Sequence, residues 1–254
     1  MEKNCILAIE SSGRTLGVGL LMFNDRGHPL FYQRLHHDRT QHAEHVLPLV
    51  SELLIQAGIE RKELSAVAFG QGPGGFTGLR VACGIAQGIA FALEIPVVPV
   101  SSLLAVAHMH RAEPFDVHVV IIDARMHELY VGAYAYHQRW QVCHQPMLIQ
   151  ARHLPLWLQQ QQSIWGKQKR IQVLGNGLQV CNDLGVCIEP FIAGPQSSPH
   201  VKQVAQLGEL GLQQNLAISP EQAAPLYIRD KIAFTIQERE QGHGGNPSAN
   251  WQPS

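Results

Sequence analysis

Polar residues that could do chemistry stand at the ends of apolar stretches in both halves of the chain. Glu10, Ser11 and Ser12 follow the first apolar run, and Asp123 and Arg125 follow another in the second half. Hydroxyl and guanidinium groups can donate hydrogen bonds to a phosphate, whereas a carboxylate can contact a nucleotide only through the nucleotide's own donors or through a cation. These five residues are therefore candidate anion or nucleotide contacts.

The simplest alternative chemistries lack their motifs. Neither Ser11 nor Ser12 lies in Gly-x-Ser-x-Gly, so a hydrogen-bonding turn is the preferred interpretation of both serines. The glycine-rich loop Gly70–Gly75 is not a Walker motif, because Phe76-Thr77 stand where a lysine is needed. We interpret it as a structural turn before a helix. An anion held at that helix N-terminus remains an alternative.

Metal chemistry has little support in the sequence. His108 and His110 are two residues apart and would point to different sides of a helix, so they are interpreted as helix-surface histidines. His42 and His45 share a face but lack a third ligand, and no His-Glu-x-x-His is present. We expect this chain to bind no metal.

The helix after the glycine loop has a sequence that indicates close packing against its neighbours. Over Gly78–Leu93 it carries two rows of small residues at spacing four, which are Gly78, Ala82, Ala86 and Ala90, and Gly84, Gly88 and Ala92. A helix that is apolar nearly all round is buried nearly all round. Close packing would offset the helical glycines, within the domain or against another subunit.

Composition indicates an ordinary globular protein. The 254 residues are 45% hydrophobic with a net charge of −1, so no basic excess indicates a stand-alone nucleic-acid-binding protein. The N-terminal apolar run is too short for a signal peptide, and no run is expected to span a membrane. Five cysteines without a Cys-x-x-Cys pair argue against disulfides and a zinc knuckle, so a cytoplasmic location is expected.

The first half predicts the order β-β-β-α-β-α-β. The expected strands are Cys5–Ile9, Thr15–Phe23, Leu30–Leu35, Ser65–Phe69 and Val97–Val100. A capping pattern at Asp38–Gln41 opens an amphipathic helix that ends at Gly58, with Pro48 expected to bend it.

The second half repeats this order more loosely. The expected strands are Val117–Ile122, Glu128–Tyr136, Val142–Ile149 and Ile171–Leu174, with helices at Leu154–Gln160, after Gly175-Asn-Gly177 and at Val201–Leu212. Tandem β-β-β-α-β-α units predict a two-lobed, duplicated α/β fold, the topology of the actin, Hsp70 and sugar-kinase (ASKHA) superfamily. We expect an N-terminal lobe at 1–102, completed by a C-terminal helix near 221–235, a C-terminal lobe at 103–220, and a disordered tail at 237–254.

Several motifs together resemble the TsaB (YeaZ) family, in order from residue 6 to about residue 234. They are Ile6-Leu-Ala-Ile-Glu10, Gly70-Gln-Gly-Pro-Gly-Gly-Phe-Thr-Gly-Leu-Arg80, Gly84-Ile-Ala-Gln-Gly88, Val100-Ser101-Ser102-Leu103, Ile122-Asp-Ala-Arg-Met126 and Tyr227-Ile-Arg229. The resemblance implies a role in placing a threonylcarbamoyl group on N6 of adenosine 37 in tRNAs that read codons beginning with A. It also implies two partners, the catalytic paralogue TsaD and the ATPase TsaE.

The superfamily's ATP site looks degenerate here. Glu10 stands where the first Asp-x-Gly turn would be, and Ala124-Arg125-Met126 replace the glycines after Asp123 in the second lobe. Side chains there obstruct a phosphate cradle. The family's catalytic paralogue holds its metal with two histidines, whose matching positions here are Ser102 and Val106. The metal is therefore expected in the partner, and ATP or ADP only at a composite interface. Arg125 could contact a phosphate, a tRNA or a lobe-bridging carboxylate.

The resemblance implies that two N-lobe helices form the subunit interface, with TsaD or with a second copy of the chain. Candidate contacts are Val46, Val50, Leu54, Thr77, Arg80, Cys83, Gln87 and Phe91. We expect a non-catalytic scaffold subunit that is a homodimer when alone and meets tRNA only in the assembled complex. The alternative is an ATPase or small-molecule kinase with a working site between the lobes.

Overall fold

The computed structural model describes residues 4–37 and 42–229, which divide into two compact units. Unit 1 contains residues up to 109 together with 199–226, and unit 2 contains 110–198 together with the segment from 227. The chain therefore passes between the units three times. The expected lobe boundary at 102 lies seven residues before the boundary at 109/110, because the helix that starts at Ser102 belongs to unit 1.

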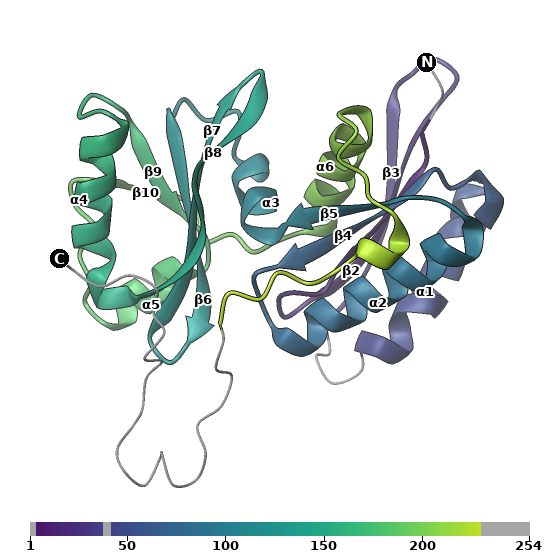
Figure 1. Ribbon diagram of the computed structural model, residues 1–254, viewed down its shortest axis with the longest axis horizontal. Helices are drawn as coiled ribbons and strands as arrows, with labels where there is room; N and C mark the ends of the chain where they lie inside the picture. The colour runs from purple at the N-terminus through teal and green to yellow at the C-terminus, as the bar shows by residue number, and fades with distance from the viewer. Residues whose placement is uncertain (1–3, 38–41, 230–254) are drawn as a thin grey trace, which may run out of the picture. The chain divides into compact units, whose positions relative to one another are not determined.

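Unit 1 is built on a five-stranded sheet in the order β3-β2-β1-β4-β5 (Figure 1). Its strands are β1 Ile6–Glu10, β2 Leu16–Phe23, β3 Pro29–His36, β4 Ala66–Gly72 and β5 Val97–Ser101. The first three strands form an antiparallel meander, and β4 and β5 run parallel to β1. The central strand β1 is buried along its whole length, and the polar turn follows its carboxyl end.

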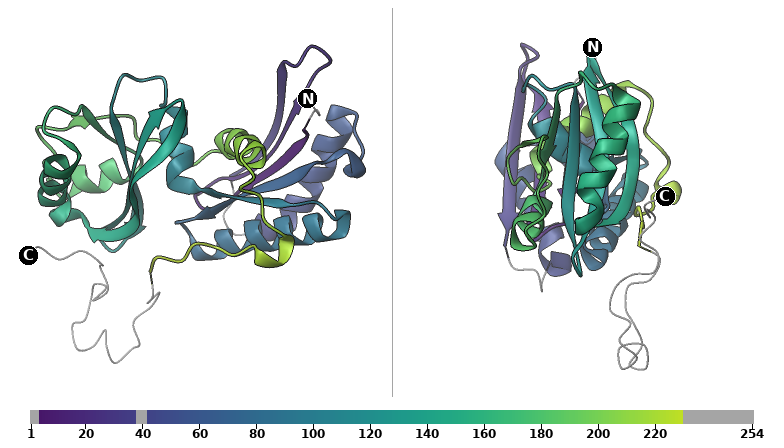
Figure 2. Two further views of the ribbon diagram at one scale, coloured as in Figure 1. Left: turned by 45° about the horizontal axis from the view of Figure 1, so that its top comes forward. Right: turned by 90° about the vertical axis from the view of Figure 1, so that its left-hand side faces the viewer.

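Helices cover both faces of this sheet. One face packs against α1 His42–Ala57 and α2 Phe76–Leu93, and the other against α6 Val201–Gln213, which also contacts α3 Ser102–Met109 (Figures 1 and 2). The 3₁₀ turns η2 Arg61–Glu63 and η4 Pro220–Gln222 complete the unit. Asp38–Gln41, the expected cap of α1, lie outside the described residues.

Unit 2 repeats the plan of unit 1. Its strands are β6 Val117–Arg125, β7 Glu128–His137, β8 Arg139–Gln150, β9 Ile171–Leu174 and β10 Ile192–Ala193. They are ordered β8-β7-β6-β9-β10, with an antiparallel meander followed by two strands parallel to β6. The helices α4 Leu154–Trp165 and α5 Gly177–Asp183, and the short η3 Ala151–His153, lie on one face of the sheet.

The matching strand order in the two units confirms the two-lobed, duplicated α/β fold. In each unit the first strand is central, the next two strands lie on one side of it, and the last two lie on the other. This arrangement places the polar turns after β1 and after β6 at equivalent positions of the two sheets.

Two expectations about the second half are corrected. The helix expected at Val201–Leu212 does form, as α6, but it packs on the sheet of unit 1. A Cβ at Gly208 would lie 2.4 Å from the Cβ of Ala68, so the absence of a side chain lets α6 approach β4 closely. The helix expected near 221–235 is absent from residues 223–229, which form no regular element. The remainder of that helix and the 237–254 tail lie outside the described residues.

The expectation that no run approaches membrane-span length is also corrected. The 18-residue α2 is long and apolar enough to cross a membrane by length and composition alone. Six of its residues, however, are buried, including the row Gly78, Ala82, Ala86 and Ala90. These residues pack against the sheet of unit 1, so one side of α2 is part of a globular core.

Candidate functional site

The Glu10 carboxyl group points into unit 1 rather than toward solvent. Its Oε1 accepts a hydrogen bond from the Ser12 backbone N at 2.6 Å, and its Oε2 accepts one from the Ser102 Oγ at 3.2 Å. Glu10 is 1% exposed, and a Cβ at Gly70 would lie 2.1 Å from Oε2. Burial raises the pKa of Glu10, and the hydrogen bonds from Ser12 and Ser102 oppose that rise. The first-lobe carboxylate is thus enclosed by protein.

The turn after β1 is locked onto the glycine loop before α2. Ser11 Oγ donates to the Gly78 carbonyl at 2.6 Å, and the Gly75 N–H donates to the Ser12 carbonyl at 2.8 Å. Ser11 and Ser12 are both buried, which fits the interpretation as a hydrogen-bonding turn. The Gly75 N–H, at the α2 N-terminus, is therefore not available to an anion.

Replacing Glu10 with glutamine is expected to alter the pH dependence of folding. The raised pKa means that folded protein holds the Glu10 proton more tightly than unfolded protein does. Glu10 therefore favours folding below the ordinary glutamate pKa, and this contribution is lost as pH rises through the raised value. Relative to Glu10→Gln, the wild-type free energy of unfolding should fall as pH rises across that window. Urea unfolding followed by circular dichroism at several pH values measures the difference, and a pH-independent difference would contradict it.

The structure splits the candidate interface residues into two groups. Val46, Val50, Leu54 and Cys83 lie in the core of unit 1, so their assignment to a partner surface is corrected. Their side chains face the unit's own sheet because they share the inward stripe of α1 and α2.

The remaining candidates lie on the outward side of α2. Thr77, Arg80 and Phe91 are exposed, with Phe91 64% exposed and the Arg80 guanidinium 3.8 Å from the Phe76 ring centroid. Gln87 is half-buried and donates through Nε2 to the Pro220 carbonyl at 2.8 Å. Three of the eight candidates are therefore exposed, and Gln87 is occupied within the unit.

Sequence reasoning missed two apolar side chains on this outward side, those of Leu47 and Ile55. Gly84 and Gly88 face open space, with no atom within 4 Å of a Cβ built at either position. On α1, which packs beside α2, Leu47 is 54% exposed and Ile55 is 81% exposed. We call the set Leu47, Ile55, Gly84, Gly88 and Phe91 the outer face of α1 and α2. The sequence feature that indicated this face was the second row of small residues, Gly84, Gly88 and Ala92. This row lies on a different side of α2 from the buried row that contacts the sheet.

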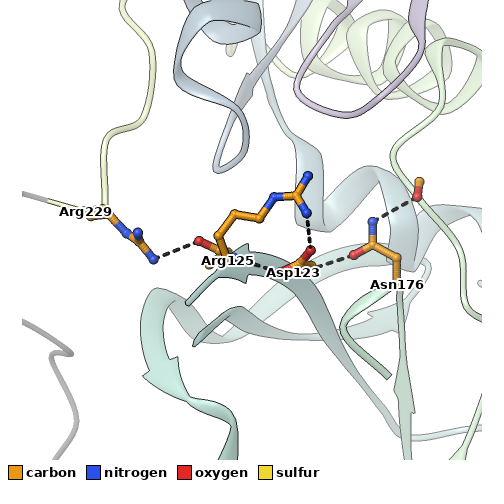
Figure 3. A network of polar contacts seen from close by, with 6 residues as sticks. Asp123, Arg125, Asn176 and Arg229 are labelled. Atoms are coloured by element: carbon orange, nitrogen blue, oxygen red, sulfur yellow. Dashed lines mark hydrogen bonds and ion pairs between the residues drawn. The ribbon is translucent and has the colours of Figure 1, made fainter. Parts of the chain in front are cut away.

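In unit 2, Asp123 and Arg125 lie at the end of β6 and pair with each other beside the turn into β7 (Figure 3). Asp123 Oδ1 accepts from the Arg125 backbone N at 2.7 Å, and Asp123 Oδ2 lies 3.3 Å from Arg125 Nη1. The three exposed residues Arg125, Met126 and His127 have φ values of 68°, 53° and 58°. Three successive non-glycine residues in the left-handed region are a strained arrangement that the surroundings must hold in place.

Asn176 and Arg229 supply the support for this turn. The sequence suggested Gly175-Asn-Gly177 only as a possible adenosine-binding turn and gave Arg229 no role of its own. Asn176 Oδ1 accepts from the Asp123 backbone N at 2.9 Å, and Arg229 Nη2 donates to the Ala124 carbonyl at 2.8 Å (Figure 3). Arg229 Nη2 also donates to the buried carboxylate of Glu128. The motif Tyr227-Ile-Arg229 was the only signal for Arg229.

The Gly175-Asn-Gly177 turn has a packing role. A Cβ at Gly175 would lie 2.2 Å from the Ile121 carbonyl oxygen, so glycine allows this turn to lie against β6 and aim Asn176 at Asp123.

The residues at and near the two positions where the catalytic paralogue has its metal-binding histidines do not form a set of metal ligands. Ser102 and Val106 are both buried in α3. Within residues 4–37 and 42–229, no group of three His, Cys, Asp or Glu residues could hold a metal ion. The two nearby histidines are not exposed on a helix surface as expected: His108 is 3% exposed, and His110 follows the end of α3 and pairs with Glu113.

This chain is similar in sequence to a known protein family and to several named proteins. A family model described as TsaD, tRNA N6-adenosine threonylcarbamoyltransferase, matches residues 37–237. The Haemophilus influenzae protein named tRNA threonylcarbamoyladenosine biosynthesis protein TsaB is 40% identical over 135 residues, which cover 51% of this chain and 53% of that protein. The match thus spans about half the length of that relative. The Escherichia coli protein of the same name is 28% identical over 76% of this chain and 83% of its own length.

A solved structure extends the match over nearly the whole chain. YeaZ from Pseudomonas aeruginosa superposes with a TM-score of 0.74 at 28% identity, covering 88% of this chain and 99% of that protein. The chain belongs to the TsaB (YeaZ) family.

Proposed function

We propose that this chain is a non-catalytic scaffold subunit for the threonylcarbamoylation of adenosine 37 in tRNAs that read codons beginning with A. In this proposal it acts with the catalytic paralogue TsaD and the ATPase TsaE. Relatives that carry the name tRNA threonylcarbamoyladenosine biosynthesis protein TsaB support the pathway. The observation that carries the scaffold role is the outer face of α1 and α2.

The outer face has the composition of a protein-binding surface. Its glycines let another backbone approach closely. Leu47, Ile55 and Phe91 expose apolar side chains to water, which is unfavourable in free energy and would be relieved by a partner. Exposed apolar residues gathered on one helix pair and beside an arginine, here Arg80, are typical of an interface core with a polar rim. A second TsaB-like or TsaD-like subunit with matching helices would cover it.

The polar turns argue against independent ATP chemistry. The Glu10 carboxyl group is enclosed, and the Asp123 carboxylate accepts from its own turn's backbone and lies beside the Arg125 guanidinium. Carboxylates that already have these partners leave few oxygen atoms within either unit to bind a metal ion or to contact a nucleotide. The proposal accordingly assigns any ATP or ADP to a composite interface and the metal to TsaD. It also assigns the protein to the cytoplasm, with a homodimer when alone and tRNA contact only in the assembled complex.

The test of this function is a transfer assay. Unmodified tRNA that reads an ANN codon is incubated with TsaD, TsaE, ATP and threonylcarbamoyl-adenylate, with and without this chain. Modified adenosine should form only when the chain is present. Equal product in its absence would overturn the scaffold proposal.

Placing a charge on the outer face should weaken partner binding. In Phe91→Glu, a carboxylate would have to be desolvated in the interface, so affinity for TsaD should fall at least tenfold, or about 1.4 kcal/mol. The matched control is Ile164→Glu on α4, which is 73% exposed in unit 2 and should bind normally. Isothermal titration with TsaD measures both variants, and equal affinities would remove the outer face from the interface.

The alternative, an ATPase or small-molecule kinase, makes a distinct prediction. Such an enzyme must bind nucleotide without partners, so titration of the isolated chain with ATP and magnesium would give heat of binding at micromolar concentrations. The scaffold proposal predicts none.

A further inference from the structure

Three side chains of unit 2 lie in the hydrogen-bonding order of a serine hydrolase triad. Ser197 Oγ is 2.8 Å from His110 Nε2, and His110 Nδ1 is 2.9 Å from Glu113 Oε1. They come from the segment after β10 and from the loop that leads into β6. The nucleophile Ser197 and the orienting carboxylate Glu113 therefore contact opposite nitrogens of the base, the His110 imidazole, as this chemistry requires.

The charge on Glu113 selects the productive tautomer of His110. Gln172 Nε2 donates to Glu113 Oε2, and this bond lowers the pKa of Glu113, with His110 lowering it further. Ionised Glu113 can only accept, so His110 Nδ1 must carry the proton that it shares with Glu113. His110 Nε2 is then left with a lone pair that faces the Ser197 hydroxyl. The neighbouring His118 is buried, and burial lowers its pKa, so it adds no positive charge near neutral pH.

The backbone on both sides of Ser197 is anchored to unit 2. The Gly194 N–H donates to the Val173 carbonyl at 2.7 Å, and the Gly175 N–H donates to the Pro195 carbonyl at 2.9 Å. On the other side, Asn176 Nδ2 donates to Ser198 Oγ at 3.0 Å. These bonds hold Ser197 beside His110 while leaving it partly exposed. A fixed, reachable hydroxyl next to a base is the arrangement needed for nucleophilic attack.

We propose that Ser197, His110 and Glu113 form an acyl-transfer site in unit 2 that hydrolyses small carboxylic esters. Ser197 Oγ attacks the acyl carbon while His110 Nε2 takes the hydroxyl proton, and the ester's alkoxy group leaves with that proton. His110 Nε2 then takes a proton from water, whose oxygen attacks the acyl carbon. The bond between that carbon and Ser197 Oγ breaks as His110 returns the proton to Ser197 Oγ, which releases the carboxylic acid and restores the Ser197 hydroxyl. Glu113 is the positioning residue. This activity goes beyond the scaffold role and does not depend on it.

The test uses the full-length chain with two probes. A fluorophosphonate should form a covalent adduct, with loss of fluoride, that mass spectrometry locates on the peptide containing Ser197. Hydrolysis of p-nitrophenyl acetate should fall at least about tenfold in Ser197→Ala and in His110→Gln. The matched control is Ser163→Ala, because Ser163 is an exposed serine of unit 2 whose Oγ donates only to the Gln159 carbonyl of its own helix.

Glu113→Gln separates positioning from simple structural support. The variant retains a side chain of the same size but loses the charge that stabilises the imidazolium formed during attack. Its pH–rate profile should therefore shift toward lower pH relative to wild type, as well as falling in height. Absence of an adduct on Ser197, or rates for Ser197→Ala within twofold of those for Ser163→Ala, would overturn the proposal. The wild-type adduct decides the matter even where a variant fails to fold.

Discussion

Replacing Gly78 with alanine is expected to destabilise unit 1 severely. A Cβ at this position would lie 1.8 Å from the Ser11 carbonyl oxygen and 2.8 Å from its carbon, both backbone atoms that cannot rotate away. The start of α2 would have to move off the turn after β1, with loss of the Ser11–Gly78 hydrogen bond. Overpacking typically costs about 1–3 kcal/mol, and the contact with fixed backbone atoms puts this substitution at the upper end, about 3 kcal/mol. The melting temperature measured by circular dichroism should fall by roughly 6–12 °C.

The same substitution two turns later on α2 provides the matched control. Gly84 also lies within the helix, but a Cβ there would meet no atom within 4 Å. Alanine should then raise stability by up to about 1 kcal/mol through helix propensity alone, in samples dilute enough to be monomeric. Opposite signs for Gly78→Ala and Gly84→Ala would show that close packing, rather than helix propensity, determines the need for Gly78. Equal effects would contradict the packing seen between α2 and the β1 turn.

This contrast also shows what the sequence could and could not predict about α2. The expectation that α2 is buried nearly all round does not hold within unit 1, where six of its 18 residues are buried. The spacing of the two small-residue rows did predict the helix itself. It could not say which row faces the sheet, because both rows are small and apolar. Ala82 proves to be fully buried in unit 1 and Gly84 to be exposed. A large residue at Ala82 would therefore disturb the core, so of these two positions only Gly84 is suitable for testing partner contact.

The helices and strands were easier to predict from the sequence than the sheet against which each of them packs. Hydrophobic patterning located β1 to β9 and α6, since it reflects burial of these elements. It missed β10, which has two residues, both exposed. Periodicity does not specify which sheet provides that burial, so α6 was expected in the second lobe although it covers the sheet of unit 1.

The same limit applies to the polar residues. Glu10 after a buried strand indicates a ligand-facing carboxylate, yet the missing side chain at Gly70, sixty residues later, makes room for it inside the protein. Such pairings depend on the folded arrangement of distant segments.

The second large effect is expected for Arg229→Met. The Arg229 side chain is 9% exposed and contacts Glu128, whose side chain is 1% exposed and which lies 101 residues earlier in the chain. Removing the guanidinium takes away the cation beside a buried carboxylate, which typically costs about 3–5 kcal/mol. It also removes the bond to the Ala124 carbonyl that supports the strained turn at Arg125. Urea unfolding followed by tryptophan emission is the suitable measurement, because Trp140, Trp157 and Trp165 all lie in unit 2.

Two further variants identify the cause of this loss. Arg125→Met removes the exposed ion pair with Asp123, in which the two side chains are 56% and 29% exposed, and should cost less than about 1 kcal/mol. The double variant Glu128→Gln/Arg229→Met removes both buried charges and should recover a large part of the stability lost in Arg229→Met, because the carboxylate that needed the cation is gone. If the double variant is no more stable than Arg229→Met, the effect comes from the Ala124 bond and from packing. In that case Arg229 acts as an anchor for the C-terminal segment at the β6–β7 turn, and its charge is incidental.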